Sequence, residues 1–69
     1  MRLKVNGENR ETKSRTLLQL LEELDVMPER VAVEVNLKVI KRADFVNYKL
    51  NEGDVVEIVY FVGGGDLRT

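Results

Sequence analysis

Apolar residues recur at every second position in two parts of the chain, which is the period of a strand with one buried face. The segments are Met1–Val5 and Val31–Val35. A third segment, Val55–Val62, is a run of β-branched and aromatic residues interrupted only by Glu57. Such a run is typical of a central strand. These patterns predict three strands, and the last is the longest.

Asn6-Gly7 follows the first strand and favours a tight hairpin turn, because both residues tolerate a positive φ. The chain then reverses into a second predicted strand, about Glu8 to Lys13. This segment is almost entirely polar and has no apolar face. We therefore expect it at an edge of the sheet.

One helix is predicted from a leucine stripe. Four leucines fall at positions i, i+3, i+4 and i+7, and they are Leu17, Leu20, Leu21 and Leu24. Ser14 or Thr16 can cap the helix, and Pro28 prevents it from continuing. In so short a domain the stripe belongs to the core, because the sheet has nothing else to pack against.

The remaining segments complete the order of elements. Val39-Ile40 predicts a short strand after a turn at 36–38, residues 45–50 predict a loop with a possible helical turn, and residues 51–54 predict a polar turn. The final strand most naturally lies beside the first, in the middle of the sheet. The chain is therefore predicted to be α+β, with a β-grasp (ubiquitin-like) domain over residues 1–62. Its mixed sheet of four to five strands packs on one main helix, and residues 63–69 form a flexible glycine-rich tail with a four-residue extension.

Composition narrows the function classes. The 69 residues have a formal charge of −1 and contain neither cysteine nor histidine. These counts exclude disulfides, thiolate nucleophiles and histidine bases, and they give no basic excess for nucleic acid. No segment has the length of a membrane helix or a secretory signal. We expect a cytoplasmic monomer that binds no metal, cofactor, nucleic acid or membrane, and one too small to be an enzyme on its own.

Gly63–Gly65 follow the strongest strand, and Asp66–Thr69 come after them. A glycine run alone usually marks a loose terminus. After a rigid strand, however, three glycines carry the chain roughly 10 Å and are slender enough to enter the active site of another protein. If such a tail ended in a carboxylate, ATP could activate it as an acyl-adenylate, and a persulfide sulfur could attack the carbonyl.

Two segments resemble the ThiS family of sulfur carriers of thiamine biosynthesis. They are Asn51–Gly65 (NEGDVVEIVYFVGGG) and Val33–Arg42 (VEVNLKVIKR), and with Asn6-Gly7 and the leucine helix the resemblance covers residues 1–65. The Gly53-Asp54 turn, the apolar strand and the closing glycine pair also occur in the small subunit of molybdopterin synthase. The short chain and the second segment favour the ThiS family.

The resemblance implies a carrier that is a co-substrate of its partner enzymes. It places the reactive carboxyl carbon on Gly65, with Gly64 before it and Gly63 as a spacer. The implied partners are a ThiF-type adenylating enzyme that uses ATP, a persulfide protein that donates sulfur, and a ThiG-type thiazole synthase that consumes the thiocarboxylate.

The chain departs from the family pattern after Gly65, since Asp66–Thr69 leave no carboxylate on that glycine. A protease trims these residues, or they are an artificial addition, or sulfur transfer has been lost. Some relatives carry a short extension that is removed, which favours processing. Leu37 is a smaller departure, because the family often has a small or polar residue in that turn.

Exposed apolar residues next to a reactive tail are typical of a docking surface. If Glu57 points outward, Val56, Ile58 and Tyr60 face the helix, and Val59 and Phe61 share the outer face. We predict Phe61, Val59 and Val62 as the partner interface, although loops could equally cover them. Lys38, Lys41 and Arg42 are interpreted as solvated rather than as a partner site, and Glu22, Glu23 and Asp25 as solubilising charges rather than metal ligands.

Two other functions stay open from the sequence. The chain could be a sulfur carrier of another pathway, of the molybdopterin type. It could also be a ubiquitin-like interaction module or protein modifier, whose tail is conjugated to a lysine or stays unreacted. Sulfur transfer in either pathway predicts a thiocarboxylate at Gly65 after trimming, a protein modifier predicts higher-mass adducts, and an interaction module predicts an intact tail.

Overall fold

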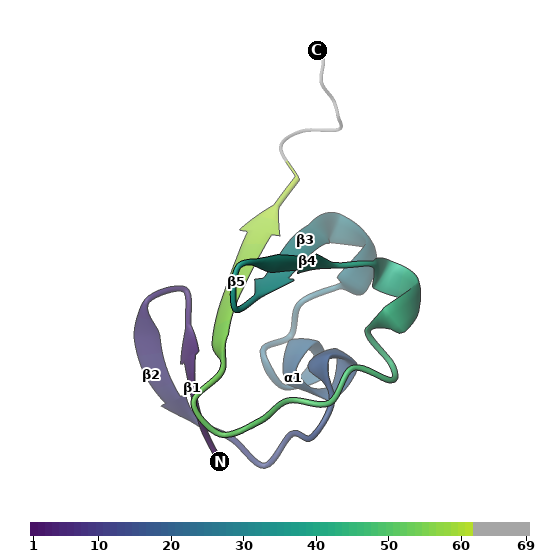
Figure 1. The fold of residues 1–69 in the computed structure, drawn as a ribbon. Coiled ribbons are helices and arrows are strands. Elements are labelled where there is room, and N and C mark those ends of the chain that lie inside the picture. The colour runs from purple at the N-terminus through teal and green to yellow at the C-terminus, as the bar shows by residue number, and fades with distance from the viewer. Residues whose placement is uncertain (62–69) are drawn as a thin grey trace.

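Five strands form one mixed sheet in the order β2-β1-β5-β3-β4 (Figure 1). The structure is a computed structural model that describes residues 1–61. The elements in chain order are β1 (Arg2–Val5), β2 (Glu8–Glu11), α1 (Leu17–Glu23), the 3-10 helix η1 (Pro28–Arg30), β3 (Val31–Val35), β4 (Lys38–Ile40), the 3-10 helix η2 (Arg42–Asp44) and β5 (Val55–Tyr60). β5 runs parallel to β1 and antiparallel to β3. The predicted order, the central last strand and the β-grasp arrangement are confirmed.

The core lies between the sheet and α1. Leu17, Leu20 and Leu21 of α1 are completely buried, and Leu24, the C-cap residue, is partly buried against them, so the leucine stripe belongs to the core. The fully buried side chains of the sheet are Leu3, Val33, Val35 and Val56. Alternation along β3 and β5 places these valines on the helix side, and no helix or strand within residues 1–61 covers the other face of the sheet.

Thr16 caps α1. The Thr16 side chain accepts a hydrogen bond from the backbone N–H of Gln19, and the Gln19 side chain accepts one from the backbone N–H of Thr16. This reciprocal pair satisfies two N–H groups that a helix start leaves free. Of the two predicted caps, Ser14 and Thr16, the structure uses Thr16.

The ends of two predicted elements differ from the structure. β2 ends at Glu11 instead of Lys13, although Thr12 still exchanges two hydrogen bonds with Met1: its N–H donates to the Met1 carbonyl oxygen at 2.8 Å, and its carbonyl oxygen accepts from the Met1 amine at 2.7 Å. The exposed fraction of Thr12 is only 4%. β2 nevertheless lies at the edge of the sheet, as its polar sequence predicted.

The segment before β5 contributes more than a loop. Its helical turn, η2, comes just before Phe45 rather than after it, and Phe45 and Leu50 are core residues. The carbonyl oxygen of Phe45 also accepts a hydrogen bond from the backbone N–H of Leu18 at the start of α1. These long-range contacts hold a stretch that has no regular period.

β5 ends at Tyr60 and Phe61 lies outside it, so the strand is shorter than the predicted 55–62; Val62 itself lies outside the described residues. The predicted domain boundary and the tail of residues 63–69 also lie outside them. Within residues 1–61, no helix has the length and apolar composition to cross a bilayer.

Candidate functional site

β5 is held on both sides as far as Ile58, and on the β3 side up to its last residue and Phe61. Tyr60 pairs with Val31 of β3, and the Phe61 N–H donates to the Arg30 carbonyl oxygen at 2.9 Å. On the other side β1 has already ended, and the Asn6 side chain takes its place. Its Oδ1 accepts from the Ile58 N–H at 2.7 Å, and its Nδ2 donates to the Ile58 carbonyl oxygen at 3.2 Å. The strand that leads to the glycines is therefore held by backbone pairing up to its last described residue.

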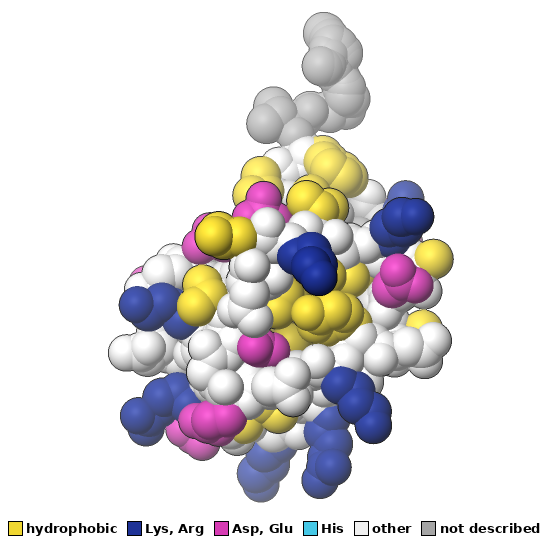
Figure 2. All heavy atoms as spheres, viewed as in Figure 1, with side chains coloured by type: hydrophobic (Ala, Val, Ile, Leu, Met, Phe, Trp, Pro, Cys, Tyr) yellow, Lys and Arg dark blue, Asp and Glu magenta, His cyan; other side chains and the backbone are white. Residues whose placement is uncertain are grey.

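The outer face of the sheet carries exposed apolar residues next to this end. The exposed fractions of Val59 and Phe61 are 60% and 62%, as the alternation around Glu57 predicted. Val59 lies opposite Ala32 of β3, which is also exposed. Figure 2 shows hydrophobic side chains gathered just below the grey residues at that end of the molecule. Their exposure is confirmed, whereas their role as a partner interface stays a prediction.

Tyr60 lies on the helix side of β5, as predicted, but it is not buried there. Its exposed fraction is 56%, whereas Val56 and Ile58 on the same side of β5 are buried. Because α1 ends at Glu23, it does not extend over the last residue of β5. Tyr60 instead lines an open groove of about 300 Å³ together with Leu24 and Val26.

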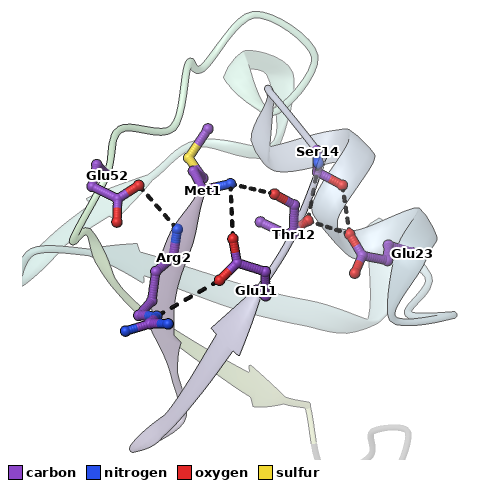
Figure 3. Close-up of polar contacts among 7 residues, drawn as sticks. All are labelled: Met1, Arg2, Glu11, Thr12, Ser14, Glu23 and Glu52. Atoms are coloured by element: carbon purple, nitrogen blue, oxygen red, sulfur yellow. Dashed lines mark hydrogen bonds and ion pairs between the residues drawn. The ribbon is translucent and has the colours of Figure 1, made fainter.

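Glu23 is exposed, as a solubilising charge would be, but its carboxylate also makes hydrogen bonds within the fold. Figure 3 shows its carboxylate turned toward Thr12 and Ser14. Both hydroxyls donate to Oε1, and the Arg10 Nη2 donates to Oε2 at 3.2 Å. The hydroxyl hydrogen bonds, followed by the Arg10 guanidinium, hold the pKa of Glu23 below its usual value. This carboxylate joins β2 and the loop after it to α1.

The other charged residues singled out from the sequence stay at the surface. Lys38, Lys41 and Arg42 are exposed, and none forms an ion pair within the described part of the chain. In residues 1–61, no three histidine, cysteine or acidic side chains come close enough to hold a metal ion.

Of the predicted site residues, the structure therefore places Val59 and Phe61 on one exposed face. Val62, Gly63, Gly64 and Gly65 lie outside the described residues. The strand register adds residues that the sequence reading did not single out. Val39 and Glu34 are opposite each other on β4 and β3, and Glu34 is also opposite Glu57 on β5. Only the pairing of strands far apart in the sequence brings these residues together.

Known proteins of similar sequence fall into two groups by length. The sulfur carrier protein ThiS of Thermus thermophilus is 38% identical over 61 residues, which are 88% of this chain and 95% of that protein. A thiazole synthase of Paramagnetospirillum magneticum is 44% identical over 66 residues, 94% of this chain but 20% of that protein. A second thiazole synthase, from Magnetococcus marinus, is 41% identical and is also matched over 20% of its length. The chain thus spans about a fifth of these two synthases.

Solved structures and a family model agree with the first group. A crystal structure of the thiamine biosynthesis protein ThiS from Geobacter metallireducens superposes with a TM-score of 0.81 at 38% identity, and the match covers 94% of this chain and all of that one. The model of the ThiS family matches residues 3–65, nearly the whole chain. The chain therefore belongs to the ThiS family.

Proposed function

We propose that this chain is a sulfur carrier of thiamine biosynthesis that holds sulfur as a thiocarboxylate on Gly65. The observation that carries the proposal is the family match, which runs through β5 and ends at Gly65. The curated ThiS carrier of similar length supports it. The comparisons do not favour a molybdopterin-type carrier or a ubiquitin-like modifier.

The chemistry takes place at the terminus and not at a side chain. In the active site of a ThiF-type enzyme, the Gly65 carboxylate displaces pyrophosphate from ATP and forms an acyl-adenylate. The sulfur of a persulfide protein then displaces AMP, and a thiol cleaves the resulting S–S bond to leave the thiocarboxylate. The chain itself binds no ATP and acts as a co-substrate in the cytoplasm, where ATP is available.

The role of the fold is to present the C-terminal segment to the partner enzymes. Backbone pairing of β5 up to Phe61 fixes the point at which the tail leaves the domain. Val59 and Phe61 expose apolar surface beside that point, and partner proteins bury such groups at the centre of an interface. We propose that these two residues, together with Val62, dock the adenylating enzyme and the thiazole synthase.

The two thiazole synthases above support a direct association with a ThiG-type enzyme, because each contains a segment similar to this chain. Asp66–Thr69 are the obstacle to the reaction, since an amide at Gly65 has no oxygen that can attack ATP. We propose that a protease removes these four residues before adenylation.

Intact mass spectrometry of the endogenous protein tests the proposal, with labile sulfur preserved and the C-terminal peptide fragmented. We expect a species that ends at Gly65, in which sulfur replaces one oxygen. The proposal fails if every molecule ends at Thr69 without added sulfur when cells are grown without thiamine. Higher-mass adducts through the tail would instead indicate a protein modifier.

A further inference from the structure

Two carboxylates lie directly opposite each other on the outer face of the sheet. In the antiparallel pairing of β3 with β5, Glu34 is the partner of Glu57. The residues before and after each glutamate are buried on the helix side, so both glutamates point to the other face. Glu57 is exposed and Glu34 is half-buried.

Like charges at directly opposed positions destabilise a sheet, because their Cβ atoms are only about 5 Å apart. No cation compensates this pair among residues 1–61. The three ion pairs found there involve the N-terminal amine, Arg2 and Arg10, and neither Glu34 nor Glu57. Lys4 on β1 lies opposite Val55 of β5 and forms an ion pair with neither glutamate. The described residues therefore leave both carboxylates without an ion-pair partner.

The surroundings of the pair are apolar. Val39 lies opposite Glu34 on the β4 side, and its exposed fraction is 68%. Toward the tail, the next opposed pair is Ala32 with Val59, and Phe61 follows. An uncovered apolar surface with two carboxylates in its middle is complementary to an apolar surface with a cation in its middle.

We propose that this face docks a partner protein that inserts an arginine or lysine side chain between the two carboxylates. The inference rests on the proposed sulfur-carrier function and specifies the chemistry of its partners. The outer face comprises Ala32, Glu34, Val39, Glu57, Val59 and Phe61. An arginine suits the position best, because its planar guanidinium can donate to two carboxylates at once and its stem packs on apolar side chains.

The same charges disfavour other occupants of the face. A second copy of this chain, related by a twofold axis through the face, would bring four carboxylates together. A nucleic acid would place phosphates against them. A cationic partner protein removes the repulsion between Glu34 and Glu57, and binding energy then comes from both the charge and the apolar contacts.

Calorimetric titration of the full chain tests this inference, with the ThiF-type enzyme and the ThiG-type synthase of the same cells as probes. The variants are Glu34→Gln and Glu57→Gln, and Glu22→Gln on α1 is the matched control, because it removes the same charge away from the sheet. We expect each sheet variant to raise the Kd about tenfold for at least one probe, since a charged hydrogen bond is lost. In both sheet variants the Kd should depend less on salt concentration. The thermal midpoint of the free domain should not decrease.

Unchanged Kd values and salt dependence in both sheet variants would overturn the inference. If Val59→Asp abolished binding at the same time, the apolar docking face of the proposed function would stand without its charged centre. The two tests can also disagree the other way. If the sheet variants bind more weakly but mass spectrometry of the endogenous protein finds no thiocarboxylate, the docking inference stands and the sulfur-carrier function fails. Self-association of the full chain that strengthens in the glutamine variants would identify a second copy as the occupant.

Discussion

At the scale of single residues, Leu37 combines two unfavourable features. It has a φ of 70°, and its exposed fraction is 88%. It is the second residue of a two-residue turn between β3 and β4, in which Asn36 also has a positive φ of 52°. A bulky side chain is strained in this region because its Cβ approaches the backbone, whereas glycine has no such contact.

Replacing Leu37 with glycine should therefore stabilise the free domain. We expect Leu37→Gly to raise the free energy of unfolding by about 0.5–1 kcal/mol, the relief of strain less the extra entropy of glycine in the unfolded chain. Urea unfolding measures the difference. Leu37→Ala is the matched control, because it removes the same apolar surface but keeps the Cβ. Equal stabilisation by both substitutions would show that backbone strain is not the cause.

Asp54, in contrast to Leu37, stabilises the fold, because its side chain holds the turn at the start of β5. Its exposed fraction is 8%, and its carboxylate accepts hydrogen bonds from Asn36 Nδ2 at 3.0 Å and from the Asn51 N–H at 2.8 Å. Asn36 Oδ1 in turn accepts from the Val55 N–H. We expect Asp54→Ala to lower the free energy of unfolding by about 2 kcal/mol, because two donors lose their charged acceptor.

The same denaturation assay gives a control for this prediction. Asp44→Ala removes an exposed aspartate and should change the stability by less than about 0.5 kcal/mol. A loss in Asp54→Ala as small as that would mean that water replaces the carboxylate at no cost.

At the scale of elements, Glu23 ties the edge strand β2 to α1 through Arg10, Thr12 and Ser14. Its pKa is lower in the folded protein than its ordinary value of 4.5. The stabilisation is therefore present above about pH 4.5 and is lost as the pH falls through the lower folded value. We expect Glu23→Gln to cost about 1 kcal/mol at pH 7 and less at pH 3.

Unfolding curves of the wild type and of Glu23→Gln at the two pH values check this sign. The neighbouring substitution Glu22→Gln should leave the difference from wild type nearly independent of pH, because that side chain makes no such hydrogen bonds. A Glu23→Gln difference that grew on acidification would contradict the assignment.

The elements that the sequence predicts well are those with a local signal. The leucine stripe specifies α1, and the alternation of β3 specifies which valines are buried. The core roles of Phe45 and Leu50 have no local signal, because these residues contact partners far away in the sequence, Leu18 of α1 and Arg15 just before it. The hydrogen bonds of Glu23 have no local signal for the same reason, since its partners come from another element.

At the scale of the whole molecule, the proposed reaction depends on a free carboxylate at Gly65. We expect a chain made to end at Gly65 to release one equivalent of pyrophosphate with the ThiF-type enzyme and ATP, and the 69-residue chain to release none. The matched control is the same 65-residue chain with a C-terminal amide, which has an identical surface but no nucleophilic oxygen. Pyrophosphate release from the amidated chain would contradict the proposed role of Gly65.

Some features of the candidate site can likewise be predicted from neighbouring residues, whereas others depend on contacts between strands far apart in the sequence. The glycine run and the exposure of Val59 and Phe61 can be read from residues that adjoin in the chain. The opposition of Glu34 and Glu57 cannot, because it requires the register between β3 and β5. The exposure of Tyr60 depends on where α1 ends relative to β5, which the leucine stripe alone does not fix.

The central place of β5 also bears on how the protein is made. The β1–β2 and β3–β4 hairpins meet only through β5 (Figure 1). A two-stranded hairpin alone is at best marginally stable in water. During synthesis on the ribosome, the nascent chain therefore cannot complete its sheet until residues 55–60 have emerged. The docking face includes β5, so it forms only when the sheet is complete. Partner enzymes can therefore bind this face only after the last strand has been synthesised.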